Sequence, residues 1–409
     1  MGTINPSKED VPQKYRVVVG AFLSLVALGL VAASFGVFFK PLSNEFGWTR
    51  GDTSGAYSTT MLVSGVLSII LGRLVDKFSH RLIILLCGAA MGCACLLLSR
   101  MNTLWELYLY FGVLVGFGMA TMIPTTSLVT RTYKEHRGLL TGLTIMGASL
   151  GSIIAAPFIT MLIENFNWRT AYLFLGMVIL VVVAISAVFL RDPAKETPST
   201  VSRNSSIPKK ILGQRSNILP KAVYSRPFWI LGIILFCVGF AQSVIMVHLI
   251  PYATDEGVSA LISASIISVF QGACAVGNFS VGRFNDIIGG KPSMVICLIS
   301  LTLSYVILLI ANTVWFFYIA AILAGIGFGG AVTLRSTIVA ELFGLHSHGE
   351  ITGRIMFIST IGSAVGPVIA GYIFDISDQY LWALITTISV CIIGLMMAGF
   401  LRSRFAMLS

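Results

Sequence analysis

Long apolar stretches separated by short polar segments make up most of the chain. A helix needs about 20 mostly apolar residues to cross a bilayer, and twelve stretches approach or exceed that length. The pattern therefore predicts an all-α membrane protein with twelve transmembrane helices. The predicted spans are 16–41, 52–72, 82–99, 104–130, 138–162, 169–190, 228–252, 259–282, 292–311, 314–340, 350–374 and 379–401.

One long polar interruption divides the predicted spans into two groups of six. Residues 191–227 are rich in Pro, Ser, Lys and Arg, a composition typical of a linker. We predict a tail at 1–15, a six-helix bundle at 16–190, a linker at 191–227, a second bundle at 228–402 and a tail at 403–409.

The two groups of helices repeat each other at an offset of about 210 residues. The matching pairs are GRLVD (72–76) with GRFND (282–286), KPLSNEFG (40–47) with IPYATDEG (250–257), and TGLTIMGASLGS (141–152) with TGRIMFISTIGS (352–363). Pseudo-symmetric halves around a central site are the architecture of many secondary transporters.

Composition and charge support a membrane environment and set an orientation. The chain is 56% hydrophobic and 11% charged, more apolar than water could solvate. Its net charge of +10 comes from basic residues between apolar runs. Aromatic residues are not interleaved with them as in nucleic-acid-binding proteins, so we expect no nucleic-acid partner. Because Lys and Arg concentrate in the tails, the linker and alternate loops, we expect both termini to be cytoplasmic in a cell membrane, plasma or inner.

Sequence signals for enzyme chemistry are missing. All seven cysteines fall within apolar runs and show no metal or disulfide spacing. The glycine-rich GFGMA and GIGFGG segments lie inside predicted helices, so they are packing glycines rather than phosphate-binding loops. We therefore expect no catalytic residues, no metal and no cofactor.

A loop motif carries a family resemblance. Gly72, Asp76, Lys77 and Arg81 fit the pattern Gly-x-x-x-Asp-Arg/Lys-x-Gly-x-Arg/Lys, with Ser79 in place of the second glycine. This pattern resembles that of the major facilitator superfamily, which implies its twelve-helix fold. The predicted conformational latch, whose charges would bond helix ends, comprises Gly72, Arg73, Asp76, Lys77, Arg81 and the degenerate copy Gly282, Arg283 and Asp286. The alternative is that these charges only set the membrane orientation.

Three further segments are similar to the monocarboxylate and oxalate–formate branch of that superfamily. They are VFFKPLSNEFGW (37–48), LTGLTIMGASLG (140–151) and NWRTAYLFLGMVI (167–179), the last followed by RDP at 191–193. The chain departs from that branch in two places. Cys274 and Asn278 stand where many members carry an Asp and an Arg, and the eleventh span lacks the lysine of the oxalate transporters.

Lys40 lies near the end of the first apolar run. The residues on its helical face, Gly36, Ala33 and Gly29, are small, which indicates a face packed against other helices. Burying a cation there costs about 2.5–3.5 kcal/mol, which a substrate anion or an internal carboxylate would offset. The resemblance implies proton and substrate handling for this lysine. Alternatively, it reaches the outer interface.

Arg335 and His248 are two further candidates for the substrate site. Arg335 lies inside the tenth span, where its planar fork suits a carboxylate, although it could instead pair with Glu341 or reach the cytoplasm. His248 could carry a proton at physiological pH, or be a buried neutral histidine. The remaining candidates are polar residues that could equally serve helix packing: Tyr57, Thr121, Gln271 and Asn278.

No Asp or Glu lies deep in any predicted span, and cations without deep carboxylates favour a negatively charged substrate. We therefore expect a secondary active transporter that moves a small organic anion, most simply a monocarboxylate with proton symport, by alternating access. Its partners would be the anion, protons and the lipid bilayer. The alternatives are an anion exchanger of the oxalate–formate type and a membrane sensor that binds a ligand without moving it.

Overall fold

The computed structural model describes residues 10–74, 78–133, 137–190, 225–344 and 348–401. Within them, twelve helices are long and apolar enough to cross a membrane, so the twelve predicted spans are confirmed, with ends that differ by a few residues. Residues 1–9 of the predicted N-terminal tail, the predicted C-terminal tail and most of the predicted linker lie outside the described residues, while α1 already begins at Asp10, inside the predicted tail. The helices are α1 (Asp10–Ala32), α2 (Ser34–Phe46), α3 (Arg50–Leu74), α4 (His80–Leu98), α5 (Leu104–Leu107), η1 (Tyr108–Val115), α6 (Gly116–Met119), α7 (Met122–Thr132), α8 (Arg137–Asn165), α9 (Trp168–Phe189), α11 (Arg226–Asp255), α12 (Ala260–Ile288), α13 (Gly290–Leu309), α14 (Val314–Phe343), α15 (His348–Ser377) and α16 (Leu381–Phe400).

Two spans are interrupted. The first consists of α1 and α2, which meet at the turn residue Ala33. The fourth consists of α5, the π-helix η1, α6 and α7, with a break at Ala120 and Thr121. Because Pro124 has no N–H to donate, the carbonyl of Ala120 loses its usual helical partner, which explains the break at this point.

Large apolar side chains are exposed along the helices. Phe279 and Val188, for example, are 79% and 74% exposed. Backbone polar groups inside a bilayer must be satisfied within the segment, which only helices and closed barrels achieve. Helices that are apolar on their outer faces therefore fit lipid as the surrounding solvent.

The chain divides into two compact units. The first contains Met1–Ser34 and Val63–Lys195, and the second contains Phe35–Leu62 and Glu196–Ser409. The segment 35–62, which holds α2 and the first half of α3, thus groups with the later helices. The two bundles expected from the sequence, 16–190 and 228–402, stay a prediction.

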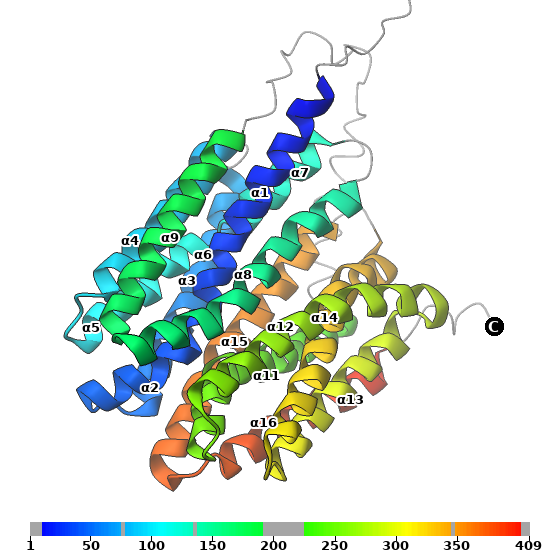
Figure 1. Ribbon diagram of the computed structural model, residues 1–409. Helices are drawn as coiled ribbons and strands as arrows, with labels where there is room; N and C mark the ends of the chain where they lie inside the picture. The colour runs from blue at the N-terminus through cyan, green and yellow to red at the C-terminus, as the bar shows by residue number, and fades with distance from the viewer. Residues whose placement is uncertain (1–9, 75–77, 134–136, 191–224, 345–347, 402–409) are drawn as a thin grey trace, which may run out of the picture. The chain divides into compact units, whose positions relative to one another are not determined.

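In the first unit, α1 packs against α8 and α9, and α4 packs against α9 and η1. Figure 1 shows α4 and α9 running alongside each other. Side-chain hydroxyls add to these contacts, because Ser152 donates to the carbonyl of Gly29 (3.0 Å) and Ser186 to that of Gly20 (2.7 Å). Small residues permit this close approach of the backbones.

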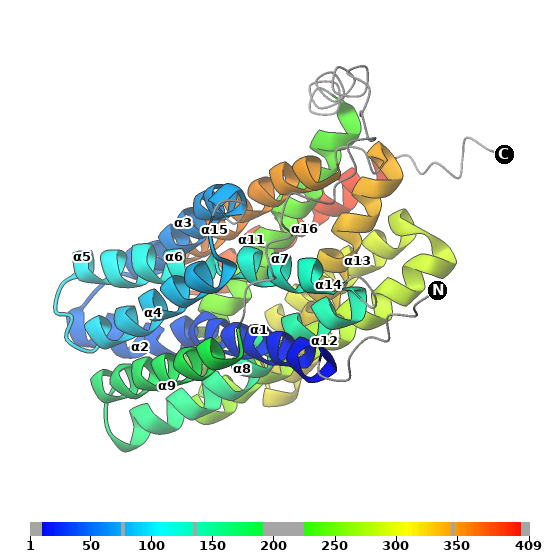
Figure 2. The same ribbon diagram turned by 90° about the horizontal axis from the view of Figure 1, so that it is seen from above.

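In the second unit, α11 packs against α15 and α16, while α14 packs against α12 and α13. These neighbours can be followed in Figures 1 and 2. α11 is buried along most of its length, from Leu231 to Ala253. Two helices, α11 and α14, thus make most of the helix contacts of the second unit.

The sequence repeat is visible as repeated contacts. In the first unit, a Cβ added at Gly151 would overlap the carbonyl of Val26; in the second, a Cβ added at Gly362 would overlap that of Phe236. Both pairs join the first helix of their repeat to the fifth, and they occupy equivalent positions. The glycines are required because the backbones are too close for any side chain.

Candidate functional site

A cluster of charged residues lies at one end of the second unit. Lys40 in the middle of α2, Arg50 at the start of α3 and Asp255 at the end of α11 meet there. The Lys40 Nζ lies 2.6 Å from Asp255 Oδ1, and the Arg50 Nη2 lies 2.7 Å from Asp255 Oδ2. Each carboxylate oxygen therefore has its own cation. We call Lys40, Arg50 and Asp255 the end cluster.

A second acid fixes the start of α3. The carboxylate of Asp375, in α15, accepts hydrogen bonds from the backbone N–H groups of Arg50 (2.8 Å) and Gly51 (2.7 Å). An acceptor with negative charge suits a helix N-terminus, whose first N–H groups lack partners within the helix. The backbone of Arg50 comes close enough because residue 371 is glycine, where a Cβ would overlap the Arg50 carbonyl. α15 thereby holds α3 in place.

Aromatic rings position the guanidinium of Arg50. It lies over the ring of Phe374, 3.6 Å from the centroid, and its Nη1 donates to the hydroxyl of Tyr380 (2.6 Å). Stacking of this kind stabilises a cation by about 0.5–2 kcal/mol. Burial raises the pKa of the Tyr380 phenol, an effect that nearby Arg50 offsets only in part. The Tyr380 hydroxyl therefore keeps its proton.

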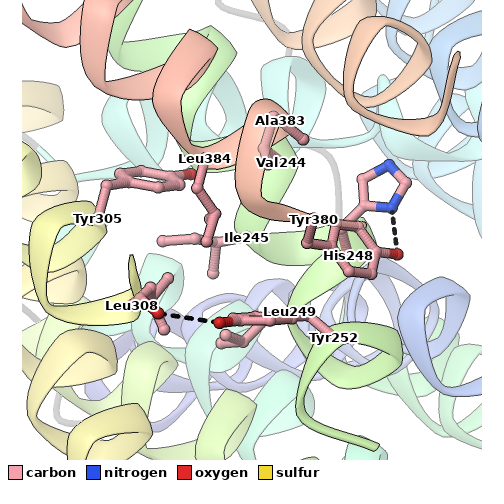
Figure 3. A pocket seen from close by; sticks show the side chains of 10 residues that line it. All are labelled: Val244, Ile245, His248, Leu249, Tyr252, Tyr305, Leu308, Tyr380, Ala383 and Leu384. Carbon is pink, nitrogen blue, oxygen red and sulfur yellow. Dashed lines mark hydrogen bonds between the residues drawn. The ribbon is translucent and has the colours of Figure 1, made fainter. Parts of the chain in front are cut away.

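His248 connects to this cluster through Tyr380. Its ring is buried on α11, with Nδ1 3.1 Å from the Tyr380 hydroxyl and Nε2 2.9 Å from the carbonyl of Pro367. A carbonyl only accepts, so Nε2 carries a proton, and in a neutral imidazole Nδ1 then accepts from Tyr380. Arg50 therefore donates to Tyr380, Tyr380 donates to His248, and His248 donates to the carbonyl of Pro367. The contact between His248 and Tyr380 is drawn in Figure 3.

A small cavity adjoins this chain of hydrogen bonds (Figure 3). His248, Tyr252 and Tyr380 line it together with apolar side chains, and the hydroxyl of Tyr252 bonds the carbonyl of Leu308 (2.9 Å). Its volume is ≈ 10 Å³, which is room for about one water molecule. An organic acid does not fit, so the end cluster is the better candidate for binding an anion.

Arg335 lies in α14 and is partly buried. Its Nε is buried without a hydrogen-bond partner, and no ion pair joins it to Glu341, although the structure describes both residues. A buried unpaired charge is costly. An anion supplied from outside the chain would offset this cost at Arg335.

The other predicted substrate residues are placed as follows. Asn278 of α12 accepts from the Thr333 hydroxyl of α14, at 3.0 Å to Oδ1, and Gln271 lies two turns earlier on the same helix. Tyr57 is buried against Phe35, with ring centroids 5.5 Å apart. Thr121 belongs to the first unit, at the break in the fourth span, and its buried hydroxyl has no hydrogen-bond partner among the described residues. His248 and Lys40 belong to one connected cluster, and ring contacts through Phe35 and Phe39 link Tyr57 to His248. Asn278 instead bonds Thr333 of α14.

The predicted latch is only partly described. Asp76 and Lys77 lie outside the described residues, while the backbones of Gly72 and Arg73 form the last turn of α3. Arg81 is an exposed residue in the first turn of α4, and Arg283 and Asp286 are exposed on α12 near Gly282. The latch stays a prediction.

Sequence reasoning missed Arg50, Asp255 and Tyr380 as members of the site. Arg50 was not singled out, because it falls in the short segment between the first two predicted spans, 16–41 and 52–72. A usable signal existed, because Asp255 and Glu45 occupy equivalent positions of the repeat at the ends of their spans. Acids recurring beside basic residues at one membrane face indicate possible ion pairs.

Comparison with known proteins identifies the family. A family model described as "Major Facilitator Superfamily" matches residues 21–279 and 257–406. The chain belongs to the major facilitator superfamily. Its family and relatives are transporters rather than enzymes, which makes it a multi-pass membrane transporter for a small molecule.

Named relatives refine this membership. The chain is 26% identical to monocarboxylate transporter 12 of Mus musculus, over 95% of this chain and 85% of the relative. It is 27% identical to monocarboxylate transporter 13 of Bos taurus, over 90% and 84%. The predicted resemblance to the superfamily and to monocarboxylate transporters is thus confirmed.

Solved structures show the same fold. The nucleoside transporter NupG matches with a TM-score of 0.77 at 13% identity, over 95% of this chain and 98% of that one. A bacterial homologue of the human lysosomal transporter Spinster, solved in an inward-facing and unoccupied conformation, matches with a TM-score of 0.75 at 16% identity, over 95% and 96%. The predicted major facilitator fold is confirmed.

Proposed function

We propose that this member of the major facilitator superfamily is a secondary active transporter that moves a small organic anion, a monocarboxylate, together with protons by alternating access. The proposal is carried by Arg335, a cation within a span that has no acidic partner among the described residues. Such intramembrane cations mark substrate pathways. The monocarboxylate transporters among the relatives supply the chemical class of the substrate.

The end cluster lies on the outer face in this proposal. Lys and Arg concentrate in the tails and the linker, and the positive-inside rule assigns those segments to the cytoplasm. Lys40 and Arg50 lie at the far end of the first two spans from the N-terminal tail, so they face the exterior. An incoming carboxylate meets positive charge there. Arg335 lies nearer the cytoplasmic end of its own span, so it offers the carboxylate a second positive charge further along its path.

His248 is the proposed proton site. Its imidazole is the buried titratable group that connects to the end cluster through Tyr380. A second proton, on Nδ1, would turn this nitrogen into a donor and leave the Tyr380 O–H without its acceptor. The new positive charge would also repel the Arg50 guanidinium, which donates to the same hydroxyl. Protonation would therefore loosen the contact between Arg50 and Tyr380 and couple proton uptake to movement at this end.

Anion exchange is the second candidate function. The acids within the described spans lie towards helix ends, so none offers a deep carboxylate as a proton carrier. An exchanger needs no such group, because the anion that leaves balances the charge of the anion that enters. A sensor that binds without transport remains the candidate from a different class, and accumulation of label inside vesicles would eliminate it.

Uptake of labelled monocarboxylates into proteoliposomes tests the proposal. We expect Arg335→Ala to lower kcat/KM by about tenfold or more, because a partner of the carboxylate is lost, and Arg335→Lys to recover part of it, because charge without the fork remains. Arg354→Ala is the matched control. It removes an exposed arginine that contacts Glu350 on α15, and its uptake should equal wild type. Equal uptake by Arg335→Ala and wild type would contradict the assignment.

A further inference from the structure

The carboxylate of Asp255 is held as a substrate carboxylate would be held. Lys40 contacts one oxygen and Arg50 the other, at 2.6 and 2.7 Å. The three side chains come from three different helices, so the ion pairs join α2 and α3 to α11. Lys40 and Arg50 thus share one carboxylate through their side chains, while the Asp375 carboxylate contacts the backbone N–H groups of Arg50 and Gly51.

Arg50 has contacts that hold its position without Asp255. Arg50 is fixed by stacking on Phe374, by the Tyr380 hydroxyl and by the contact of its backbone N–H with Asp375. Removing Asp255 would therefore leave the Arg50 fork aimed at an empty place of carboxylate size. Preorganised donors of this kind bind a ligand with little loss of conformational entropy.

Water reaches this group. The side chains of Lys40 and Asp255 are each 28% exposed and that of Arg50 is 16% exposed. An anion from the solvent can therefore approach the cations before the Asp255 carboxylate has left. Exchange of one carboxylate for another also costs less than burying a new charge, because the number of buried charges does not change.

We propose that Asp255 is an internal mimic of the substrate, and that Arg50 is a second anion-binding residue beside Lys40. An arriving carboxylate replaces Asp255 on both cations. Asp255 is then released, the ion pairs from α11 to α2 and α3 are lost, and this end of the unit opens. Substrate binding and opening are thus one competition for the same two cations. The inference rests on the proposed function, because the competitor is the carboxylate of the transported acid.

Removal of the competitor is the direct test. In proteoliposomes, Asp255→Asn should lower the half-saturation concentration for labelled external monocarboxylates by at least about fivefold, the lower range of typical coupling between sites. Arg50→Lys, which keeps the charge but loses the fork, should raise it by about tenfold. Glu256→Gln is the matched control, since it removes the same charge from the adjacent, exposed residue. It should leave the value unchanged. An unchanged value in Asp255→Asn or Arg50→Lys would overturn the inference.

A second measurement reports opening without transport. Ser54 is buried beneath the cluster and contacts His248 at 3.2 Å, so Ser54→Cys gives a protected reporter thiol. Its labelling by a membrane-impermeant thiol reagent, above that of the parent protein, should accelerate when Asp255→Asn is added and when saturating monocarboxylate is supplied. If no monocarboxylate increases the labelling rate of this thiol, the inference is overturned.

The two measurements separate this inference from the proposed function. If wild-type vesicles accumulate no acid, the proposed transport fails. An acid-dependent rise in labelling that disappears in Arg50→Lys would then still support competition at Lys40 and Arg50. Normal accumulation with Asp255→Asn indistinguishable from wild type would have the opposite meaning: transport stands and the mimic is rejected.

Discussion

At the scale of single residues, the site depends on matched donors and acceptors. Tyr380 accepts from Arg50 and donates to His248, so its hydroxyl satisfies one buried and one partly buried polar group at once. It occupies this place because Asp378 adopts a positive φ of 53° in the turn before it, a conformation that Asp tolerates better than most residues. Loss of the hydroxyl leaves two partners unsatisfied.

We expect Tyr380→Phe to lower the free energy of unfolding by about 1–3 kcal/mol, the cost of unsatisfied buried polar groups. Burial raises the pKa of this phenol. Above its ordinary pKa of about 10, the unfolded chain ionises before the folded one, so the benefit of the tyrosine is constant at lower pH and declines as pH rises beyond that value. Thermal unfolding in detergent between pH 6 and 11 measures both effects.

Tyr372→Phe is the control for this experiment, because Tyr372 is 62% exposed on α15. It should change neither the melting temperature nor its pH dependence. If Tyr380→Phe melted like wild type at every pH, the hydrogen bonds of this hydroxyl would contribute nothing to stability.

At the scale of helices, close backbone contacts hold pairs of spans together. In the first unit, α1 and α8 approach through Gly29, Gly147 and Gly151, where added Cβ atoms would overlap carbonyls of the facing helix. These contacts are not equally demanding along α8, since a Cβ at Gly142 would meet nothing within 4 Å. The difference gives a prediction with its control on one helix.

Gly151→Ala should destabilise the protein by about 1–3 kcal/mol, because the added methyl group forces α1 and α8 apart. Gly142→Ala should be neutral or slightly stabilising, since alanine favours a helix more than glycine does. Thermal unfolding of the two variants in the same detergent compares them directly. Equal melting temperatures would show that the two helices separate without cost.

The sequence predicted the helices better than the contacts among them. Spans follow from apolar length alone, and the repeat correctly placed Gly151 and Gly362 at equivalent positions. Hydropathy is blind to the hydrogen-bond register of the backbone, so the π-helix and the break at Thr121 were not predicted. The pairing of Lys40 with Asp255 could not be predicted either, because it depends on how distant segments pack. From the sequence we expected only that a carboxylate, from the substrate or from the chain itself, would contact Lys40.

At the scale of the whole molecule, the question is which ion gradient drives transport, that of the proton or that of a second anion. The proposed symport needs a proton site that changes its charge during the cycle, and His248 is the candidate in the described residues. Exchange needs none. Vesicles without internal anion, exposed to an inward acid gradient, distinguish the two, because only symport accumulates label in them.

We expect His248→Gln to abolish acid-driven accumulation while it preserves exchange between internal and external anion, since glutamine retains hydrogen-bonding groups but does not titrate. His80→Gln is the matched control: His80 is also buried and contacts a hydroxyl, that of Ser127 at 3.4 Å. Accumulation should persist in that variant. Acid-driven accumulation in His248→Gln would assign the proton to another group.

The partial exposure of the end cluster also ties the protein to the composition of its surroundings. Ion pairs that touch water weaken as dissolved electrolyte increases, and the screening length shortens from about 30 Å at 0.01 M to about 8 Å at 0.15 M. The ion pairs of Lys40 and Arg50 with Asp255 would therefore be strong at low ionic strength and weak at high ionic strength. In the orientation proposed above, with the end cluster at the exterior, opening at this end would therefore depend on the salt concentration outside the cell.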